Sequence, residues 1–270
     1  MATLTRARPE IRPLTNHVGA EALHFDLKAL DDDALRLLER TLYDRTMLVI
    51  RNQFLNPDEQ LAFTRRWGPV YITPYVKKLE GYPEVLAVVN WGKAKTVTEA
   101  WHSDATFQPE PPGVAILTAQ VLPKAGGDTM FANGYVAYDA LSPAMKKLVA
   151  GLHCVHVDTV LAKFAGITDA NTKPQSHPVV RTHPITGRKS LFVNTLFSQH
   201  FEGMTVEESR GLLAYLCEHA SRYEFTYRHR WLPGDVVMWD NRCAVHYAVH
   251  DYGEEERVLH RTTVVGGKPV

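Results

Sequence analysis

The residues with the clearest chemical potential are His102 and Asp104, which stand two positions apart in the run Trp101-His102-Ser103-Asp104-Ala105-Thr106-Phe107. In an extended chain, residues i and i+2 point to the same face, so this imidazole and this carboxylate can converge on one point. They would supply two of the three ligands of a 2-His-1-carboxylate site, which holds iron(II) and leaves coordination positions open. A short His-x-Asp pattern also arises by chance, and the alternative is that Asp104 is an ordinary turn residue.

Support comes from the C-terminal part of the sequence, where His246 follows a predicted buried strand and the turn Asp240-Asn241. Arg257 and Arg261 come next, and the alternation of a strand places both on one face. Burying two guanidinium groups is unfavourable unless they find partners, and anionic ligands in the mouth of a barrel would provide them. The alternatives are a solvated Arg257 beside the acidic run 254–256 and an Arg261 that pairs with a carboxylate of a lid.

The elements that must position these residues indicate a mainly β protein with flanking helices. Apolar spacing and N-terminal capping residues predict helices over 31–44, from Asn56 to about Trp67, over 142–150 and over 205–222. Strand-like runs occupy 47–50, 85–89, 114–121, 223–231, 235–239 and 258–265. Many short strands with few peripheral helices favour a jelly roll, or double-stranded β-helix, formed by a single domain of residues 1–270. The pattern-poor segment at about 158–175 is interpreted as a lid-like loop over the site.

Composition narrows the class of protein. Lys plus Arg and Asp plus Glu both number 30, so a net charge of zero gives no support for nucleic-acid binding. The three cysteines are odd in number and widely spaced, which favours free thiols in a reducing cytoplasm. The N-terminal residues lack the apolar segment of a signal peptide, and no apolar run reaches the length of a membrane span. We therefore expect a soluble cytoplasmic protein with no membrane partner.

Several motifs together resemble those of the iron(II)- and 2-oxoglutarate-dependent dioxygenases of the taurine dioxygenase and 2,4-dichlorophenoxyacetate dioxygenase (TauD/TfdA) family. The resemblance extends from about Ile11 to Lys268. The motifs that carry it are Trp101-His102-Ser103-Asp104 with Thr106-Phe107, Gly126-Gly127-Asp128-Thr129, His183-Pro184 with Gly187-Arg188, Leu191-Phe192-Val193-Asn194, Trp239-Asp240-Asn241-Arg242, His246, Arg257 and Arg261.

The resemblance implies a role for each matching position at the cofactor site. It implies that His102, Asp104 and His246 bind Fe(2+), where O2 would react. It also implies that Arg257 binds the distal carboxylate of 2-oxoglutarate and that Thr129 hydrogen-bonds the same group; the alternative for Thr129 is that it only caps its turn. The implied fold is the double-stranded β-helix, and family members suggest a homo-oligomer, either a dimer or a tetramer.

Three further positions concern the primary substrate. Arg261 matches the family arginine that meets the anionic group of the substrate, and Phe197 matches an aromatic residue that lines the pocket. Thr73 stands where the taurine enzymes have a sulfonate-binding histidine, and the segment 96–100 replaces an asparagine-rich pocket segment. These departures argue against taurine itself. The resemblance still implies a small organic anion, such as a sulfonate, a sulfate ester or an aryloxyalkanoate, which is hydroxylated with release of succinate and CO2.

Two other functions remain open from the sequence. One is a jelly-roll metalloenzyme that uses the same three ligands without 2-oxoglutarate, and the other is a non-catalytic jelly-roll binding domain. The intact ligand set and the two arginines argue against the binding domain, because a protein without turnover has no need for five convergent polar groups. The presence of Asp104 argues against a halogenase, which would need that ligand position vacant. The remaining histidines are interpreted as structural or exposed.

Overall fold

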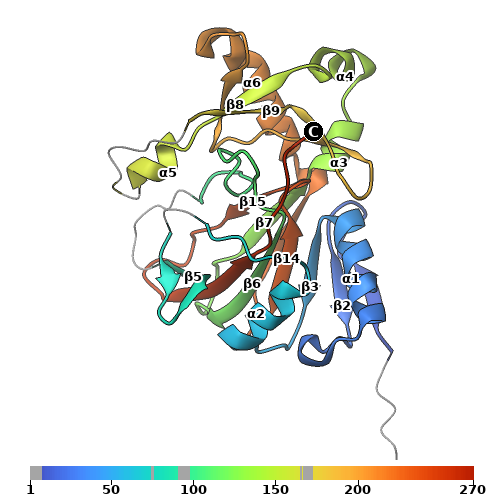
Figure 1. Ribbon diagram of the computed structural model, residues 1–270, viewed down its shortest axis with the longest axis vertical. Helices are drawn as coiled ribbons and strands as arrows, with labels where there is room; N and C mark the ends of the chain where they lie inside the picture. The colour runs from blue at the N-terminus through green and yellow to red at the C-terminus, as the bar shows by residue number, and fades with distance from the viewer. Residues whose placement is uncertain (1–7, 74–75, 91–97, 165, 167–172) are drawn as a thin grey trace, which may run out of the picture.

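The computed structural model describes residues 8–73, 76–90, 98–164, 166 and 173–270, and a large twisted sheet forms its centre (Figure 1). This sheet has eight strands, in the order β1 (Glu10–Pro13), β2 (Ala20–Leu23), β3 (Met47–Ile50), β14 (Val236–Asp240), β6 (Val114–Val121), β16 (Arg257–Thr263), β5 (Tyr82–Asn90) and β4 (Lys78–Leu79). Within it, β2 and β3 are parallel and the other neighbours are antiparallel. Strands far apart in the chain are therefore neighbours at the centre.

A second sheet packs against the first. It consists of β13 (Thr226–His229), β7 (Thr129–Asn133) and β15 (Ala244–Ala248), all antiparallel. Between the two sheets lies a buried apolar cluster in which Phe131 of the small sheet meets Trp239 of the large one, with ring centroids 5.5 Å apart. The two facing sheets form the jelly roll, so the fold predicted from the sequence is confirmed.

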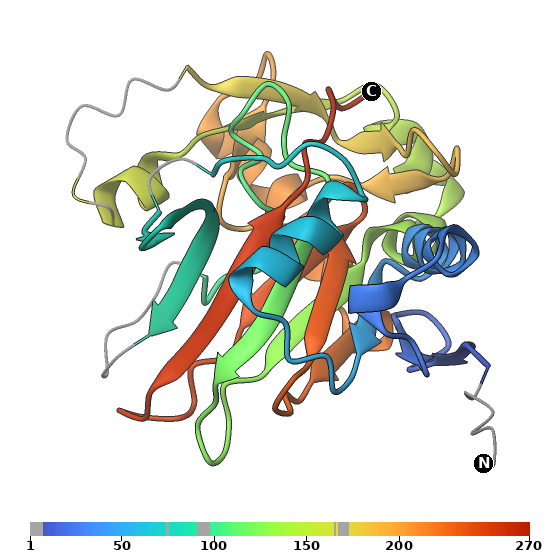
Figure 2. The ribbon, with the colours of Figure 1, turned by 60° about the horizontal axis from the view of Figure 1, so that its bottom comes forward.

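Helices cover the outer face of the large sheet (Figure 2). They are α1 (Asp32–Arg45) and α2 (Pro57–Arg65), with the short 3-10 helix η1 (Leu27–Ala29) beside them. The predicted start of α2 is confirmed, because Asn56 accepts a hydrogen bond from the backbone N–H of Glu59 while the Glu59 side chain bonds back to Asn56. Leu38 and Leu42 of α1 pack on the sheet, as their spacing predicted.

A third group of elements closes one end of the jelly roll. It contains the sheet β12 (Ser198–Phe201), β8 (His153–His156), β9 (Gln175–Pro178), the hairpin β10 (Val180–Thr182) and β11 (Lys189–Leu191), and the helices α3 (Gly134–Asp139), α4 (Pro143–Val149) and α6 (Val206–Ala220). A separate apolar cluster, which includes Leu216 and Phe201, holds this group together. The predicted helices at 142–150 and 205–222 correspond to α4 and α6.

Three sequence-based expectations need correction. The segment 158–175 is not irregular throughout, because α5 (Thr159–Phe164) forms there and Leu161 packs against the apolar cluster beside the candidate site. Residues 165 and 167–172 of that segment lie outside the described residues. The run 223–231 is a strand only from Thr226, since the 3-10 helix η2 (Tyr223–Phe225) precedes it. β5 begins at Tyr82, three residues before the strand-like run 85–89 that the sequence predicts.

None of the helices in the described part of the chain combines the length and the apolar content that a membrane span requires.

Candidate functional site

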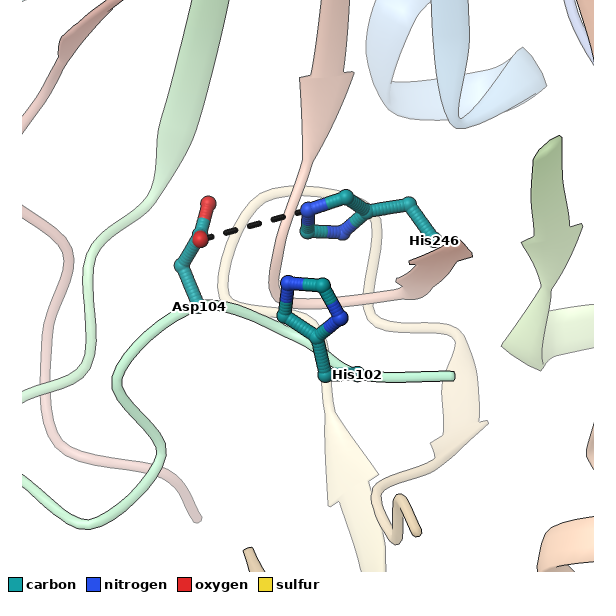
Figure 3. Close-up of side chains that lie close together, drawn as sticks. All are labelled: His102, Asp104 and His246. Carbon is teal, nitrogen blue, oxygen red and sulfur yellow. Dashed lines mark ion pairs between the residues drawn. The ribbon is translucent and has the colours of Figure 1, made fainter. Parts of the chain in front are cut away.

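Two histidines from distant parts of the chain meet at the mouth of the jelly roll (Figure 3). His246 lies on β15, and the chain at His102 forms a two-way backbone bridge with it, because each backbone N–H donates to the other residue's carbonyl at 3.0 and 2.7 Å. This bridge places the two imidazole rings 4.1 Å apart between centroids. Both side chains are buried. The backbone bridge therefore fixes how close the two rings lie.

Asp104 completes the group that the sequence predicted. One ligand atom from each of His102, Asp104 and His246 lies within 4.8 Å of the others, and all three residues are buried. The chain is extended only as far as Ser103, whose hydroxyl donates to the carbonyl of Ala244 at 2.7 Å. Asp104 itself opens a turn. The turn interpretation of Asp104 therefore applies, and its position beside the two histidines leaves the ligand interpretation open as a proposal.

The donor atoms of this group fit a divalent metal ion. His102 Nδ1 donates to the carbonyl of Ala100 at 2.8 Å, so its Nε2 keeps a lone pair for a metal. Burial lowers the pKa of His102 and lowers the pKa of His246 well below its usual value, which keeps both rings neutral, as metal ligands must be. The buried Asp104 Oδ2 has no hydrogen-bond partner among the described residues. An ionised oxygen without a donor indicates a position where a cation belongs.

Arg261 contacts the carboxylate of this group. Its Nη1 donates to Asp104 Oδ1 at 2.7 Å, whereas the sequence had suggested a carboxylate of the lid as an alternative partner. Burial alone would raise the pKa of Asp104, but Arg261, followed by His246 and His102, lowers it to about 2. Asp104 is therefore ionised at neutral pH and has one oxygen paired with Arg261 and the other free.

Arg257 lies deeper in the barrel and has no carboxylate within ion-pair distance among the described residues. Its Nε donates to the carbonyl of Gly127 at 2.9 Å, and its Nη2 approaches Thr129 Oγ1 at 3.4 Å. Gly127 has φ +71°, and a Cβ there would lie 3.0 Å from Arg257 Cδ, so the turn needs glycine to admit the arginine. Burial lowers the pKa of Arg257. A buried guanidinium without an acid suits an anionic ligand.

Both arginines and one of the candidate metal ligands, His246, line the same cavity. Its lining is Val88, Thr98, Leu117, Thr129, Trp239, His246, Ala248, Arg257 and Arg261. Alternation along β16 thus brings both arginines to one face, as the sequence predicted. A larger cavity, of ≈ 370 Å³, lies elsewhere along α6 and β12. None of the three candidate metal ligands lines that cavity, so its size does not make it the reaction site.

Of the predicted substrate residues, Phe197 lies beside the candidate metal ligands, whereas Thr73 does not line the cavity that the two arginines line. The Phe197 ring lies 6.4 Å from the His102 ring in an edge-to-face arrangement, and it belongs to a buried apolar cluster with Phe107 and Leu196. Thr73 is buried, and its carbonyl accepts a hydrogen bond from Lys78 Nζ. Part of the other departure, residues 96 and 97, lies outside the described residues.

The segment around the turn Asp240-Asn241, which the sequence marks only as preceding His246, contacts two of the candidate ligands. Asn241 Oδ1 accepts hydrogen bonds from the backbone N–H of Asp104 at 3.1 Å and from Trp239 Nε1 at 2.9 Å. The Trp239 ring in turn packs 4.6 Å from the His246 ring. The role of Asn241 could not be derived from the sequence, because its partner lies 137 positions away. Trp239 therefore packs beside the candidate site.

A second group of His183, Asp240 and Cys243 also has ligand atoms within 4.8 Å of one another. Here both carboxylate oxygens are occupied, since Arg242 donates to Asp240 Oδ1 at 2.8 Å and to Oδ2 at 2.6 Å. His183 Nε2 donates to the same Oδ2 at 3.0 Å. Burial raises the pKa of Cys243 well above its usual value, so the thiol stays protonated. This group is a satisfied ion-pair cluster and not a metal site.

Comparison with known proteins places the chain among oxygenases. Residues 10–263 match the model of the family described as "Taurine catabolism dioxygenase TauD, TfdA family". The chain is 36% identical to the alpha-ketoglutarate-dependent 2,4-dichlorophenoxyacetate dioxygenase of Cupriavidus pinatubonensis, over 94% of this chain and 96% of that protein. It is 32% identical to the alpha-ketoglutarate-dependent sulfate ester dioxygenase of Pseudomonas putida, over 97% of this chain and 91% of that protein.

Solved structures agree with these relatives. A taurine dioxygenase from Burkholderia xenovorans superposes with a TM-score of 0.86 at 34% identity, covering 97% of this chain and 92% of that one. AAD-2, solved in complex with Mn(II) and N-oxalylglycine, superposes with a TM-score of 0.85 at 32% identity, covering 97% of this chain and 99% of that one.

Proposed function

The chain belongs to the taurine catabolism dioxygenase TauD, TfdA family, and from this membership we propose how its own residues bind cofactor and substrate. The enzyme class is iron(II)- and 2-oxoglutarate-dependent dioxygenase, the class of the relatives. The proposed substrate is a small organic anion, an aryloxyalkanoate, a sulfonate or a sulfate ester. Its C–H group becomes C–OH, while 2-oxoglutarate and O2 give succinate and CO2.

The observation that carries the site assignment is the shared cavity. His246, one of the three candidate ligands, lines it together with Arg257, a buried arginine that lacks an acid. The neighbouring Asp104 keeps one oxygen without a partner among the described residues. His102, Asp104 and His246 would hold iron(II), which supplies the oxidising chemistry together with 2-oxoglutarate and O2. Arg257 would bind the distal carboxylate of 2-oxoglutarate beside Thr129, and selects a dicarboxylate over a simple keto acid.

The remaining residues would bind and orient the substrate. Arg261 would meet its anionic group, and Phe197 and Leu161 would form an apolar wall on the His102 side. The wall would exclude water from the reacting C–H group and hold it near the metal ligands. Arg261 would also keep Asp104 Oδ1 engaged, which fixes the orientation of Oδ2.

The test of the cofactor assignment is an anaerobic titration of the metal-free protein with iron(II) and 2-oxoglutarate. We expect a weak visible charge-transfer band, with an apparent affinity for 2-oxoglutarate that falls about 10- to 100-fold in Arg257→Ala, because a charge-assisted hydrogen bond is lost. The matched control is Arg36→Ala, which removes an exposed arginine from α1. Iron binding without the band, and an unchanged Arg257→Ala, would favour the metalloenzyme that does not use 2-oxoglutarate.

Absence of succinate formation with every anionic candidate would favour the non-catalytic binding domain. Three statements about the whole protein belong to the same proposal: a single domain of residues 1–270, a cytoplasmic location and a homo-oligomeric assembly, either a dimer or a tetramer. The location is supported by the three cysteines, which are buried and free. Analytical ultracentrifugation of the purified protein tests the assembly.

A further inference from the structure

The turn at residues 194–197 contacts the segment of the candidate metal ligands on the side that precedes His102. The backbone N–H and the Oγ1 of Thr195 both donate to the carbonyl of Trp101, at 3.1 and 2.8 Å. Trp101 is the residue directly before His102. Two hydrogen bonds occupy both lone pairs of this carbonyl oxygen, so the backbone that leads into His102 is anchored to the turn.

The same turn contacts this segment on the side that follows Asp104. Asn194 Nδ2 donates to Thr106 Oγ1 at 3.2 Å, and both side chains are buried. Thr106 Oγ1 also lies 2.9 Å from Nδ1 of the buried His156 on β8. Burial lowers the pKa of His156 to about 3, so its ring is neutral and Nδ1 can accept the hydrogen bond of the Thr106 hydroxyl. The hydroxyl of Thr106 is thus bonded on two sides.

The side chain of Asn194 also shapes the turn that carries Phe197. Its Oδ1 accepts the backbone N–H groups of Leu196 and Phe197, at 3.2 and 2.9 Å, as Asn side chains do in many turns. The Phe197 ring lies 6.4 Å from the His102 ring. A single buried amide therefore bonds through its oxygen to the backbone of the aromatic residue, and through its nitrogen to the residue two positions after Asp104.

This double use of one amide bears on the distance between substrate and metal. Phe197 belongs to the turn before β12, whereas His102 and Asp104 belong to the segment between β5 and β6. The hydrogen bonds of Asn194 and Thr195 join these two segments, which lie far apart in the sequence. Because a displacement of about 1 Å at a reacting centre can lower a rate about 100-fold, such a link can decide whether a bound C–H group reacts.

We propose that Asn194 and Thr106 are positioning residues that tie the Phe197 side of the substrate site to the segment of the metal ligands, so that consumption of 2-oxoglutarate stays coupled to oxidation of the substrate. This inference rests on the proposed function for the roles of the metal ligands and of Phe197. Neither Asn194 nor Thr106 lines the cavity that His246 shares with the arginines, so both act through other residues.

The coupling has a measurable consequence. In the coupled reaction, one oxygen atom of O2 enters succinate and the other enters the substrate. When the link is cut, the substrate C–H group lies out of reach, and the second oxygen atom is instead reduced to water by two electrons and two protons from ascorbate supplied in the assay. Succinate then forms without oxidised substrate.

The link is tested first in metal-free protein, by hydrogen exchange followed by mass spectrometry of peptides that contain Leu196 and Phe197. Thr106→Val removes the hydroxyl at nearly unchanged size, and Thr106→Ser keeps it. The matched control is Thr64→Val, which alters a buried threonine of α2 whose hydroxyl donates to the carbonyl four positions earlier, at 2.7 Å. Circular dichroism melting establishes that each variant is folded.

We expect the amides of Leu196 and Phe197 to exchange about tenfold faster in Thr106→Val, because the Asn194 side chain loses its anchor. Thr106→Ser should stay within about threefold of the wild type. Thr64→Val should leave the exchange of these peptides unchanged even where it lowers the melting temperature, so the readout separates a positioning role from a general loss of stability.

The coupling is tested in protein loaded with iron(II) and 2-oxoglutarate, with ascorbate present. The substrate probe is phenoxyacetate, hexyl sulfate or hexanesulfonate, whichever the wild type oxidises fastest. We expect the ratio of oxidised product to succinate to fall at least about tenfold in Thr106→Val and in Asn194→Ala. The double variant should resemble Asn194→Ala alone, because both substitutions cut the same link. The apparent affinity for 2-oxoglutarate, measured by the anaerobic charge-transfer band, should stay within about threefold in Thr106→Val.

Unchanged exchange of the two amides in folded Thr106→Val would overturn the proposal, and so would faster exchange with an unchanged ratio of product to succinate. A failure of the proposed function gives a different result, since the wild-type protein itself would then form no charge-transfer band. If the band forms but none of the probes is oxidised, the hydrogen-exchange result decides, because it needs no substrate.

Discussion

Among the described residues, two buried groups have side chains spaced as metal ligands would be, His102–Asp104–His246 and His183–Asp240–Cys243, and they differ in what their carboxylates contact. In the first, Asp104 shares one oxygen with Arg261 and leaves Oδ2 without a partner among the described residues. In the second, Asp240 has both oxygens bonded, to Arg242 and to His183. Both clusters meet the same distance criterion for a metal site. Proximity of ligand atoms therefore does not distinguish them.

The difference teaches that free ligand atoms, and not the residue types, distinguish the first cluster from the second. A cation beside Asp240 would have to displace Arg242, because the guanidinium already donates hydrogen bonds to both carboxylate oxygens. A cation beside Asp104 would contact Oδ2, the carboxylate oxygen that has no hydrogen-bond partner among the described residues. The second cluster instead fixes a hairpin, since His183 Nδ1 accepts the backbone N–H groups of Ile185 and Thr186 at 3.3 and 3.2 Å.

Removal of a ligand from the first cluster should have the largest effect. We expect His246→Ala to lower turnover at least about 1000-fold and to abolish stoichiometric iron binding, because one of three protein ligands is lost. Cys243→Ala, the matched change in the second cluster, should bind iron as the wild type does. Anaerobic iron titration with metal analysis measures both. Loss of iron binding in Cys243→Ala would show that the second cluster takes part.

Disruption of the second cluster should instead affect stability. We expect Asp240→Asn to lower the free energy of unfolding by about 3–5 kcal/mol, because it leaves Arg242 as a poorly compensated, largely buried charge. Denaturant unfolding followed by fluorescence measures the change. Asp44→Asn is the control, since its ion pair with Arg188 is exposed and should contribute less than about 1 kcal/mol. Equal losses of unfolding free energy in the two variants would contradict the difference expected between a buried and an exposed ion pair.

A substitution in the turn that lies between the two clusters should have a smaller effect, on the affinity for iron. Asn241→Ala removes the acceptor of the Asp104 backbone N–H, and we expect iron affinity to fall about 10- to 100-fold, as for other positioning residues. Asn16→Ala, in the loop before β2, is the control. The informative readout is the affinity for iron in protein that melts cooperatively. An Asn241→Ala protein with wild-type iron affinity would show that the hydrogen bond does not position the ligand.

The smallest effect is the change with pH in the stability that Asp240 contributes. Burial would raise the pKa of Asp240, but Arg242 and His183 outweigh it and hold the pKa below its ordinary value of 3.8. A carboxyl with a lowered folded-state pKa stabilises the protein above its unfolded-state pKa and loses that contribution as pH falls. The stability difference between wild type and Asp240→Asn should therefore shrink below about pH 4, by at most about 1.4 kcal/mol per pH unit. A constant difference down to acid unfolding would contradict this account.

The sequence predicted the fold well where local rules decide it. The capping box of α2, the apolar stripe of α6 and the continuous apolar run of β6 each appear as expected, because capping and burial periodicity act over a few residues. The prediction was wrong at 159–164, where α5 forms without a strong local signal. Its Leu161 is packed against residues near 105 and 197, so tertiary contact supports that helix.

For the site, the sequence identified His102, Asp104 and His246 as candidate ligands by residue type, and alternation predicted that Arg257 and Arg261 share one face of a strand. Their roles remain proposals, and the resemblance to a family supplied them. Residue type and alternation are properties of a short stretch of chain, so a sequence carries them directly.

Only the tertiary structure decided which polar groups are satisfied. That His183 bonds to Asp240 and that Asn241 supports Asp104 both depend on contacts between segments far apart in the chain. Register is set by the packing of whole sheets, since a shift of one residue would reverse every side chain. The sequence therefore determined the ligands available to this protein, and the packing of its two sheets decided which of them were left without a partner.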